Sequence, residues 1–272
     1  MAPPDQISVP DLSRLIGTPR VPTLVDVCID EDFNADSRLI PTSIRWPHTD
    51  IASLVPRLSE FEVVVICQKG LKLSQGAAAV LRAHGIRAES LEGGNSAWRD
   101  AGEILVPAEK IPERNAAGQT VWVTRQRPKT DRIACPWLIR RFIDRNAQFL
   151  FVAPSQVSMV AEKFGATPFD VEDVFWSHRD ERCTFDIMIE EFSLENEPLL
   201  QLANIVRGAD TNQHDLAPEA AGLLAASLGL SQMYDDDLEQ LDAGMTLYDA
   251  FYRWARDASD EGQNWPAALN AN

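Results

Sequence analysis

The chain has 272 residues, of which 45% are hydrophobic, and its formal net charge is −16. This length predicts about two domains, and the hydrophobic fraction is that of a folded protein rather than a disordered one. The acidic balance argues against a nucleic-acid partner and against docking on anionic lipid, because both attract cationic surfaces.

Charge is distributed unevenly along the chain. Residues 1–110 carry 11 basic and 15 acidic side chains. Residues 125–145 carry seven basic and two acidic side chains, whereas residues 146–272 carry six basic and 23 acidic ones. The basic segment could therefore bind small oxyanions although the chain as a whole is negatively charged. The Pro- and Gly-containing stretch 109–120 predicts a linker between a first domain over 1–108 and a second over 121–258. Residues 259–272 are expected to form a frayed tail.

The first domain shows short apolar runs alternating with helical patterns. Residues 23–27, 63–66 and 88–91 predict strands that are buried on both faces. Residues 74–84, with Ser74 as a plausible N-cap, and residues 95–101 predict helices. This alternation indicates a doubly wound α/β fold around a parallel sheet.

Cys67 directly follows the strand predicted at 63–66 and opens a loop that leads into a helix. Ligands of open parallel sheets bind beyond the carboxyl ends of the strands. Loop N–H groups and the helix dipole can bind an anion there, and Lys69 and Lys72 add positive charge. These features favour a reactive thiolate at Cys67. The alternative is a small buried residue that ends a strand.

Three segments in this order resemble the rhodanese (sulfurtransferase) family over roughly residues 5–106. They are Leu24-Val25-Asp26-Val27, the Cys-x-x-Gly-x-basic loop Cys67-Gln68-Lys69-Gly70-Leu71-Lys72, and the closing stretch Gly93-Gly94-Asn95-Ser96-Ala97-Trp98. The resemblance implies that Cys67 carries sulfur as a persulfide and that the transfer needs no cofactor. It places substrate or anion binding at Asp26 and at the loop residues Gln68, Lys69, Gly70, Leu71, Lys72 and Leu73.

Two positions bear on this resemblance. Cys28 stands where the family often has Arg, and it is either a packing residue or a resolving thiol for a Cys67 persulfide. Leu73 stands where related phosphatase loops carry the Arg that grips phosphate, which disfavours a phosphatase.

The second domain predicts an α+β fold that becomes helix-rich toward its C-terminus. Strands are expected at 121–124 and 148–152. A helix is expected over 132–144, capped by Thr130 or Asp131, and another over 157–164, ended by Gly165. Four further helices are expected at 184–193, 197–207, 218–228 and 236–256.

Several segments of this domain resemble the carboxy-terminal domain of the chromate-resistance B family over about residues 120–256. The segments are 129–144, Pro168-Phe169-Asp170, His178 with Cys183-Thr184-Phe185-Asp186, and 205–210. The resemblance implies a sensing or protective role in chromate or oxyanion stress.

The sequence offers two alternative ligand sites in this domain. Cys183, Asp186 and Glu190 share one helix face by their spacing, and with His178 they could bind a divalent transition metal. Solvated surface is the alternative for such a face. Asp131, Arg132 and Cys135 near a helix N-terminus could instead receive an oxyanion, and Asp210 is grouped with them.

Taken together, the sequence predicts a sulfurtransferase fused to a domain associated with chromate resistance. Its expected partners are a small sulfur donor, a thiol acceptor and small oxyanions, whereas the oligomeric state is open. A metal or oxyanion sensor without turnover and a thiol-based oxyanion reductase are the alternatives. Four well-separated cysteines and the absence of a visible signal peptide predict free thiols in the cytoplasm.

Overall fold

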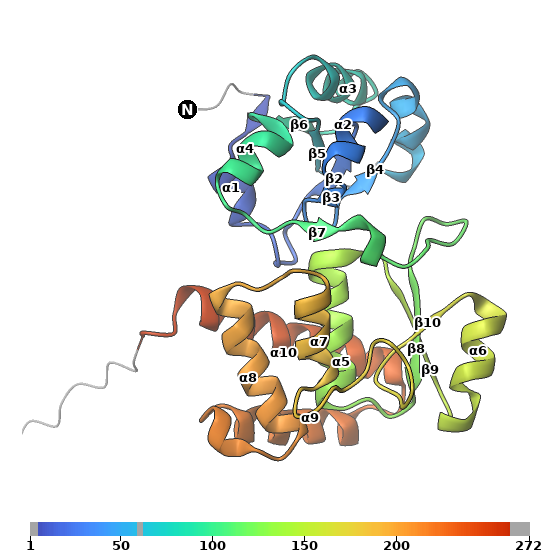
Figure 1. Ribbon diagram of the computed structural model, residues 1–272, viewed down its shortest axis with the longest axis vertical. Coiled ribbons are helices and arrows are strands. Elements are labelled where there is room, and N and C mark those ends of the chain that lie inside the picture. Colours follow the sequence, from blue (N-terminus) through green and yellow to red (C-terminus); the bar gives the residue numbers. More distant parts are fainter. Residues whose placement is uncertain (1–4, 59–61, 262–272) are drawn as a thin grey trace, which may run out of the picture.

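The computed structural model describes residues 5–58 and 62–261 (Figure 1). The N-terminal part contains a five-stranded, fully parallel sheet in the order β1-β6-β5-β2-β4. Its strands, in that order, are Gln6–Ile7, Ala88–Leu91, Val63–Ile66, Thr23–Asp26 and Ile44–Arg45. Its helices are α1 Val9–Ser13, α2 Asp30–Ala35, the 3-10 helix η1 His48–Arg57, α3 Lys72–Ala83 and α4 Gly94–Asp100. Strands β3 (Arg38–Leu39) and β7 (Val106–Pro107) pair separately in antiparallel fashion.

This sheet is covered on both faces, which confirms the predicted doubly wound α/β fold. In β5, Val64 and Ile66 pack into the cluster that contains Leu12 of α1 and Trp98 of α4. The alternate residues Val63 and Val65 pack against the other cluster, with residues of α3 and η1. Because side chains alternate across a strand, a strand buried on both sides must be apolar throughout.

The start of α3 differs from the prediction. The helix begins at Lys72, with Leu71 at the N-cap position, so Ser74 lies inside the first turn and is not the N-cap. The Ser74 hydroxyl instead lies 3.1 Å from Cys67 Sγ.

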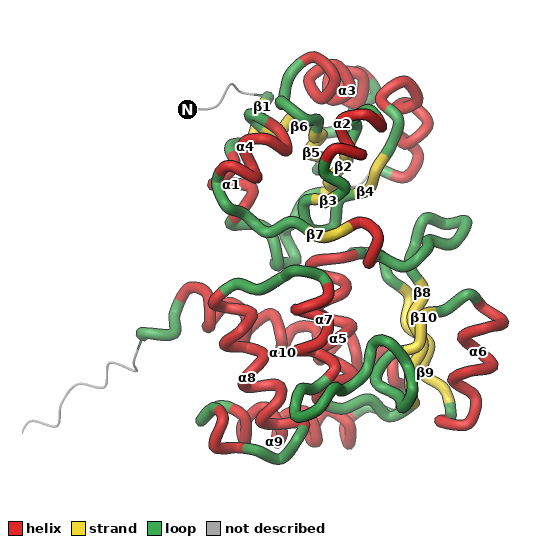
Figure 2. The backbone as a smooth tube through the Cα atoms, viewed as in Figure 1, coloured by secondary structure: helices red, strands yellow, loops and turns green. Residues whose placement is uncertain are grey.

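The C-terminal part has a small parallel sheet beside a group of helices (Figure 2). Its strands, in sheet order, are β10 Thr167–Pro168, β8 Val121–Arg125 and β9 Gln148–Val152. Its helices are α5 Thr130–Leu138 with the π-turn η3 Ile139–Ile143, α6 Val157–Phe164, α7 Thr184–Glu191, α8 Glu197–Asp210, α9 Ala220–Met233 and α10 Asp237–Asp257. Short 3-10 helices lie at η2 Ala108–Lys110, η4 Pro154–Gln156 and η5 His214–Leu216. This arrangement confirms the helix-rich α+β fold.

The predicted start of α5 is wrong. The helix begins at Thr130 with Lys129 at the N-cap position, so neither Thr130 nor Asp131 caps it. The Asp131 carboxylate turns instead to the first backbone N–H groups of α7. Pro136 is consequently an interior residue of α5 rather than part of its first turn.

The two parts pack directly against each other. Buried residues of both belong to one apolar cluster, which runs from Val9 to Tyr252. Gly17 has a φ of +74°, and a Cβ there would lie 2.6 Å from a ring carbon of Phe142. The backbone N–H of Thr42 also donates to the Phe142 carbonyl at 3.0 Å.

The segment predicted as a linker is anchored to the C-terminal part near its start and at its middle. Lys110 pairs with Glu191 at 2.7 Å, and Arg114 pairs with Asp144 at 3.0 Å. Most of the predicted tail, residues 262–272, lies outside the described residues. No helix within residues 5–58 and 62–261 has both the length and the apolar character to cross a bilayer.

Candidate functional site

Cys67 lies immediately after β5, where the chain turns tightly toward α3. Gly70 has a φ of +64°, and a Cβ at that residue would lie 2.4 Å from the Leu91 carbonyl oxygen. On the facing loop, a Cβ on Gly94 would lie 1.9 Å from the Cys67 carbonyl oxygen. That carbonyl accepts a hydrogen bond from the Asn95 N–H at 3.1 Å. The close approach of the two loops, which only glycine permits, fixes the path of the chain around Cys67.

The loop leaves a row of backbone donors without acceptors. None of the N–H groups from Gln68 to Ser74 donates to another group of the described chain. These donors include the first turn of α3, whose dipole also favours negative charge. The loop residues therefore form a surface that can bind a small anion next to Cys67.

The Cys67 side chain is almost fully buried. The residue is 4% exposed, and its Sγ contacts the Ser74 hydroxyl at 3.1 Å. Around it, Lys69, Leu71 and Lys72 are exposed, whereas Gln68 and Leu73 are half-buried. A small anion that presents one outer sulfur suits this access better than a bulky substrate does.

Asp26 and Cys28 lie beside the loop and have structural partners. The Asp26 carboxylate is buried and accepts from the Cys28 N–H at 2.8 Å and from Asn95 Nδ2 at 2.9 Å. Burial, and then the nearby Asp26 carboxylate, raise the pKa of the Cys28 thiol far above its ordinary value. This favours a protonated Cys28 in a packing role. Asn95, which joins the loops after β2 and β6, carried no signal in the sequence.

A pocket of about 330 Å³ opens next to Cys28. Arg45, Trp46 and His48 line it on the side of β4 and η1. The Arg45 guanidinium donates to the Cys28 carbonyl at 3.1 Å and pairs with Asp30 at 2.9 Å.

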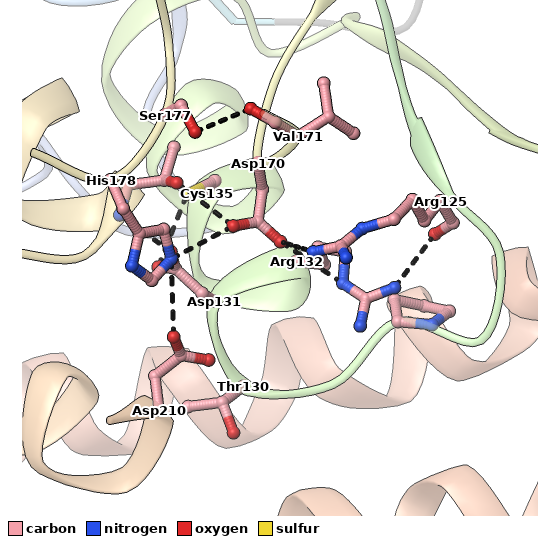
Figure 3. A network of polar contacts seen from close by, with 12 residues as sticks. Arg125, Thr130, Asp131, Arg132, Cys135, Asp170, Val171, Ser177, His178 and Asp210 are labelled. Atoms are coloured by element: carbon pink, nitrogen blue, oxygen red, sulfur yellow. Dashed lines mark hydrogen bonds and ion pairs between the residues drawn. The ribbon is translucent and has the colours of Figure 1, made fainter. Parts of the chain in front are cut away.

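The second candidate site lies in the C-terminal part, around the imidazole of His178 (Figure 3). His178 Nε2 lies 3.1 Å from Asp170 Oδ1, 3.4 Å from Asp131 Oδ2 and 3.5 Å from Asp210 Oδ2. Asp131 comes from the start of α5, Asp170 from the turn after β10, and Asp210 from the end of α8. Three segments far apart in the sequence thus bring carboxylates to one ring nitrogen.

Other groups hold these carboxylates in place. Asp131 accepts from the N–H groups of Thr184 at 2.8 Å and Phe185 at 3.0 Å, which open α7. The outer oxygen of Asp170, Oδ2, contacts Arg125 at 3.3 Å and Arg132 at 3.2 Å. Arg132 is therefore engaged by Asp170 rather than directed to an open anion site.

The electrostatics of the cluster follow from burial and proximity. Hydrogen bonds with Asp131 and Asp170 raise the pKa of His178 to about 10. In the absence of a bound ligand, the imidazole ring is therefore protonated at neutral pH. Burial, and then the neighbouring carboxylates of Asp131 and Asp170, raise the pKa of Asp210 to about 7.

The residues grouped with His178 by spacing have partners elsewhere. Cys183 is fully buried at the N-cap of α7, and its Sγ lies 3.3 Å from Asp186 Oδ2. Asp186 pairs with Arg207 at 3.1 Å, and Glu190 pairs with Arg182. Across the described ranges, the group of ligand atoms that gather within 4.8 Å of one another consists of Asp131, Asp170 and His178.

Cys135, proposed with Asp131 and Arg132 for oxyanion binding, is also fully buried. Its thiol lies 3.6 Å from Asp131 Oδ1, and burial followed by that carboxylate raises its pKa well above the ordinary value. Burial has the same effect on the pKa of Cys183. All four cysteines are free.

The basic segment 125–145 is largely paired. Arg140 contacts Asp242 at 3.2 Å, and Arg141 binds Asp249 through two nitrogens at 2.7 and 2.8 Å. Arg145 donates to Thr23 Oγ1 at 3.2 Å. The arginines thus join α5 and η3 to α10 and to the N-terminal sheet.

Comparison with known families agrees with both halves of this structure. Residues 8–101 match the family model of the rhodanese-like domain, and residues 122–255 match that of the ChrB C-terminal domain. The chain therefore carries a rhodanese-like domain followed by a ChrB C-terminal domain, as the sequence motifs predicted.

One curated relative also resembles this chain. Protein ChrB of Cupriavidus metallidurans is 31% identical over 168 residues, which cover 57% of this chain and 50% of that protein. The chain thus spans about half the length of this curated relative.

Solved structures match the N-terminal part. A thiosulfate sulfurtransferase from Pseudomonas aeruginosa is 28% identical, with a TM-score of 0.33, over 37% of this chain and 19% of its own. A rhodanese-related protein from Thermoplasma volcanium is 24% identical, with a TM-score of 0.33, over 37% of this chain and 96% of its own.

Proposed function

We propose that the N-terminal domain is a sulfurtransferase that forms a persulfide on Cys67. The observation that carries this proposal is that Cys67 directly precedes seven consecutive N–H groups, Gln68 to Ser74, that have no acceptor in the described chain, and that its Sγ lies 3.1 Å from the Ser74 hydroxyl at the end of this run. These groups would stabilise the negative charge of an outer sulfur, as backbone donors do for oxyanions.

The transfer would proceed in two displacement steps. The Cys67 thiolate attacks the outer sulfur of a donor such as thiosulfate, a sulfur–sulfur bond forms, and sulfite leaves with the electron pair of the broken bond. The thiolate of an acceptor then attacks the outer sulfur, which leaves the acceptor as a persulfide and restores the Cys67 thiolate. Ser74, 3.1 Å away, would donate its hydroxyl hydrogen to that thiolate.

The C-terminal domain matches the ChrB family, and this match is the basis for linking the proposed activity to chromate or oxyanion resistance. A reductase that used several thiols is disfavoured, because burial holds Cys135 and Cys183 as protonated thiols. An anion sensor without turnover remains the second candidate, since the same N–H groups would bind an anion without reaction.

The test is a thiosulfate-to-cyanide transfer assay on the full chain, with Cys67→Ser and the matched Cys28→Ser. We expect Cys67→Ser to abolish the transfer and Cys28→Ser to retain it. Intact mass spectrometry after thiosulfate treatment should show one added sulfur atom in the wild type and in Cys28→Ser. Undiminished transfer by Cys67→Ser would contradict the proposal. A folded wild type that binds thiosulfate but never gains sulfur would establish the sensor.

A further inference from the structure

Carboxylate oxygens of three aspartates lie around one imidazole nitrogen, His178 Nε2. An imidazole nitrogen carries at most one hydrogen, yet Nε2 has three carboxylate oxygens within 3.1 to 3.5 Å. Two of the three carboxylates therefore approach the ring without a donor from it. Figure 3 shows the side chains pointing toward this common centre.

The spacing of these atoms suits one shared ion. First-row metals bind carboxylate oxygen and imidazole nitrogen at about 2.0–2.2 Å, which places neighbouring ligand atoms about 2.8–3.6 Å apart in octahedral or tetrahedral geometry. The separations from His178 Nε2 fall in this range. The ligand atoms of Asp131, Asp170 and His178 also all lie within 4.8 Å of one another.

The environment of Asp210 also favours a cation. Asp210 is the last residue of α8, where the helix dipole disfavours a negative charge. Its carboxylate lies 3.5 Å from His178 Nε2, the same ring nitrogen that the Asp131 and Asp170 carboxylates approach. A cation bound beside these groups would offset the unfavourable effect of the dipole.

The surrounding contacts resemble the outer shell of a metal site. The outer oxygen of Asp170 is held by Arg125 and Arg132, and Asp131 is held by the first N–H groups of α7, so the inner oxygens are oriented before any ion binds. The His178 side chain is 40% exposed, which gives an ion a path from solvent and leaves room for water or a ligand.

We propose that Asp131, Asp170 and His178 bind one divalent first-row transition ion, and that the neighbouring carboxylate of Asp210 adds negative charge beside it. Oxygen and nitrogen donors without a thiolate favour ions such as Mn²⁺ and Zn²⁺. This site is independent of sulfur transfer at Cys67, and it differs from the Cys183-containing set that residue spacing favoured.

The test is a titration of the chelator-treated full chain with Mn²⁺. The electron paramagnetic resonance signal of free Mn²⁺ reports how much of the ion is bound, and a second titration measures whether Zn²⁺ displaces it. We expect one ion per chain. His178→Gln and Asp210→Asn, which change side chains that are partly exposed, should each raise the Kd at least about tenfold. Circular dichroism in chelator should show both variants folded.

Three controls separate this site from other sources of binding. His214→Gln and Asp215→Asn alter exposed residues of η5 and should leave the Kd unchanged. Cys183→Ser should also leave it unchanged, and the Co²⁺ form should lack a thiolate-to-cobalt charge-transfer band. A folded wild type without saturable binding of Mn²⁺ or Zn²⁺ at millimolar concentration would overturn the proposal. Equal Kd values in His178→Gln, Asp210→Asn and the wild type would overturn it as well.

Discussion

The loop around Cys67 and the cluster around His178 are built from different groups. The loop uses seven consecutive backbone N–H groups beside one thiol, and its charged side chains, Lys69 and Lys72, are exposed. The cluster uses charged side chains from segments between residues 131 and 210, and its inner carboxylates are mostly buried.

This difference determines which substitutions each site should tolerate. The loop depends on the path of the backbone, so residues without functional groups, above all its glycines, are expected to be critical. The cluster depends on the side chains themselves, so its sensitivity should follow charge and hydrogen-bonding capacity. Two experiments test this contrast, and a third tests an ion pair outside both sites.

The largest effect is expected from Gly94→Ala. The new Cβ would lie 1.9 Å from the Cys67 carbonyl oxygen and 2.5 Å from the Gly70 nitrogen, at a φ of +59°. Neither backbone atom can move without distorting the loop, so we expect a loss of more than about 3 kcal/mol in the free energy of unfolding. Urea denaturation measures it.

Gly76→Ala is the matched control, because Gly76 lies inside α3 with nothing within 4 Å of its added Cβ. Alanine should stabilise the helix there by about 0.5–1 kcal/mol. If Gly94→Ala were as stable as the wild type, the close approach of the two loops would be refuted.

A smaller loss is expected from Asp131→Ala in the cluster. The change removes the acceptor of the Thr184 and Phe185 N–H groups and leaves both buried at the start of α7. We expect a loss of about 2–3 kcal/mol in chelator-containing buffer, measured by urea denaturation. Asp242→Ala removes an exposed partner of Arg140 and should cost less than about 1 kcal/mol. Equal losses in the two variants would contradict the structural role of Asp131.

The smallest effect concerns pH and the contact between the connecting segment and the C-terminal domain. A hydrogen bond from Lys110, then one from Arg179, lowers the pKa of Glu191. Because the folded pKa lies below the unfolded one, this carboxylate contributes stability above the ordinary glutamate pKa of about 4.3. The contribution is lost as the pH falls from there through the lowered pKa.

Glu191→Gln should therefore be less stable than the wild type at pH 7, by about 1 kcal/mol, and the difference should shrink between about pH 5 and pH 3. Thermal melts across this range measure it. A difference that stays constant with pH would exclude this ion pair as its origin.

The Cys67 loop is close to what the sequence predicts, because its determinants are contiguous. The run Val63–Ile66 is apolar at every position, and the structure places a strand there with both faces covered. The features that were not predicted from the sequence depend on contacts between residues in the folded chain. Ser74 is suited to an N-cap, but the turn at Gly70 starts the helix two residues earlier and brings its hydroxyl to Cys67.

The cluster in the C-terminal domain was predictable only in pieces. Asp131 and Asp210 were grouped in one candidate oxyanion site, whereas helical spacing joined His178 to Cys183, Asp186 and Glu190 in another. Residue spacing identifies neighbours within one helix and says nothing about partners from other elements. Asp170 follows β10, a strand of two residues that is too short to show periodicity. The signal for Asp170 was its place in the Pro168-Phe169-Asp170 segment of the family resemblance, which did not indicate its partners.

Gly17 limits which N-terminal domains could replace the one in this chain, because an added Cβ at this residue would collide with the rings of Phe142 and Tyr252. The two halves therefore meet closely at a point where this chain has no side chain. A rhodanese-like domain with a larger residue at this position could replace residues 1–108 only if its backbone moved away from the two rings.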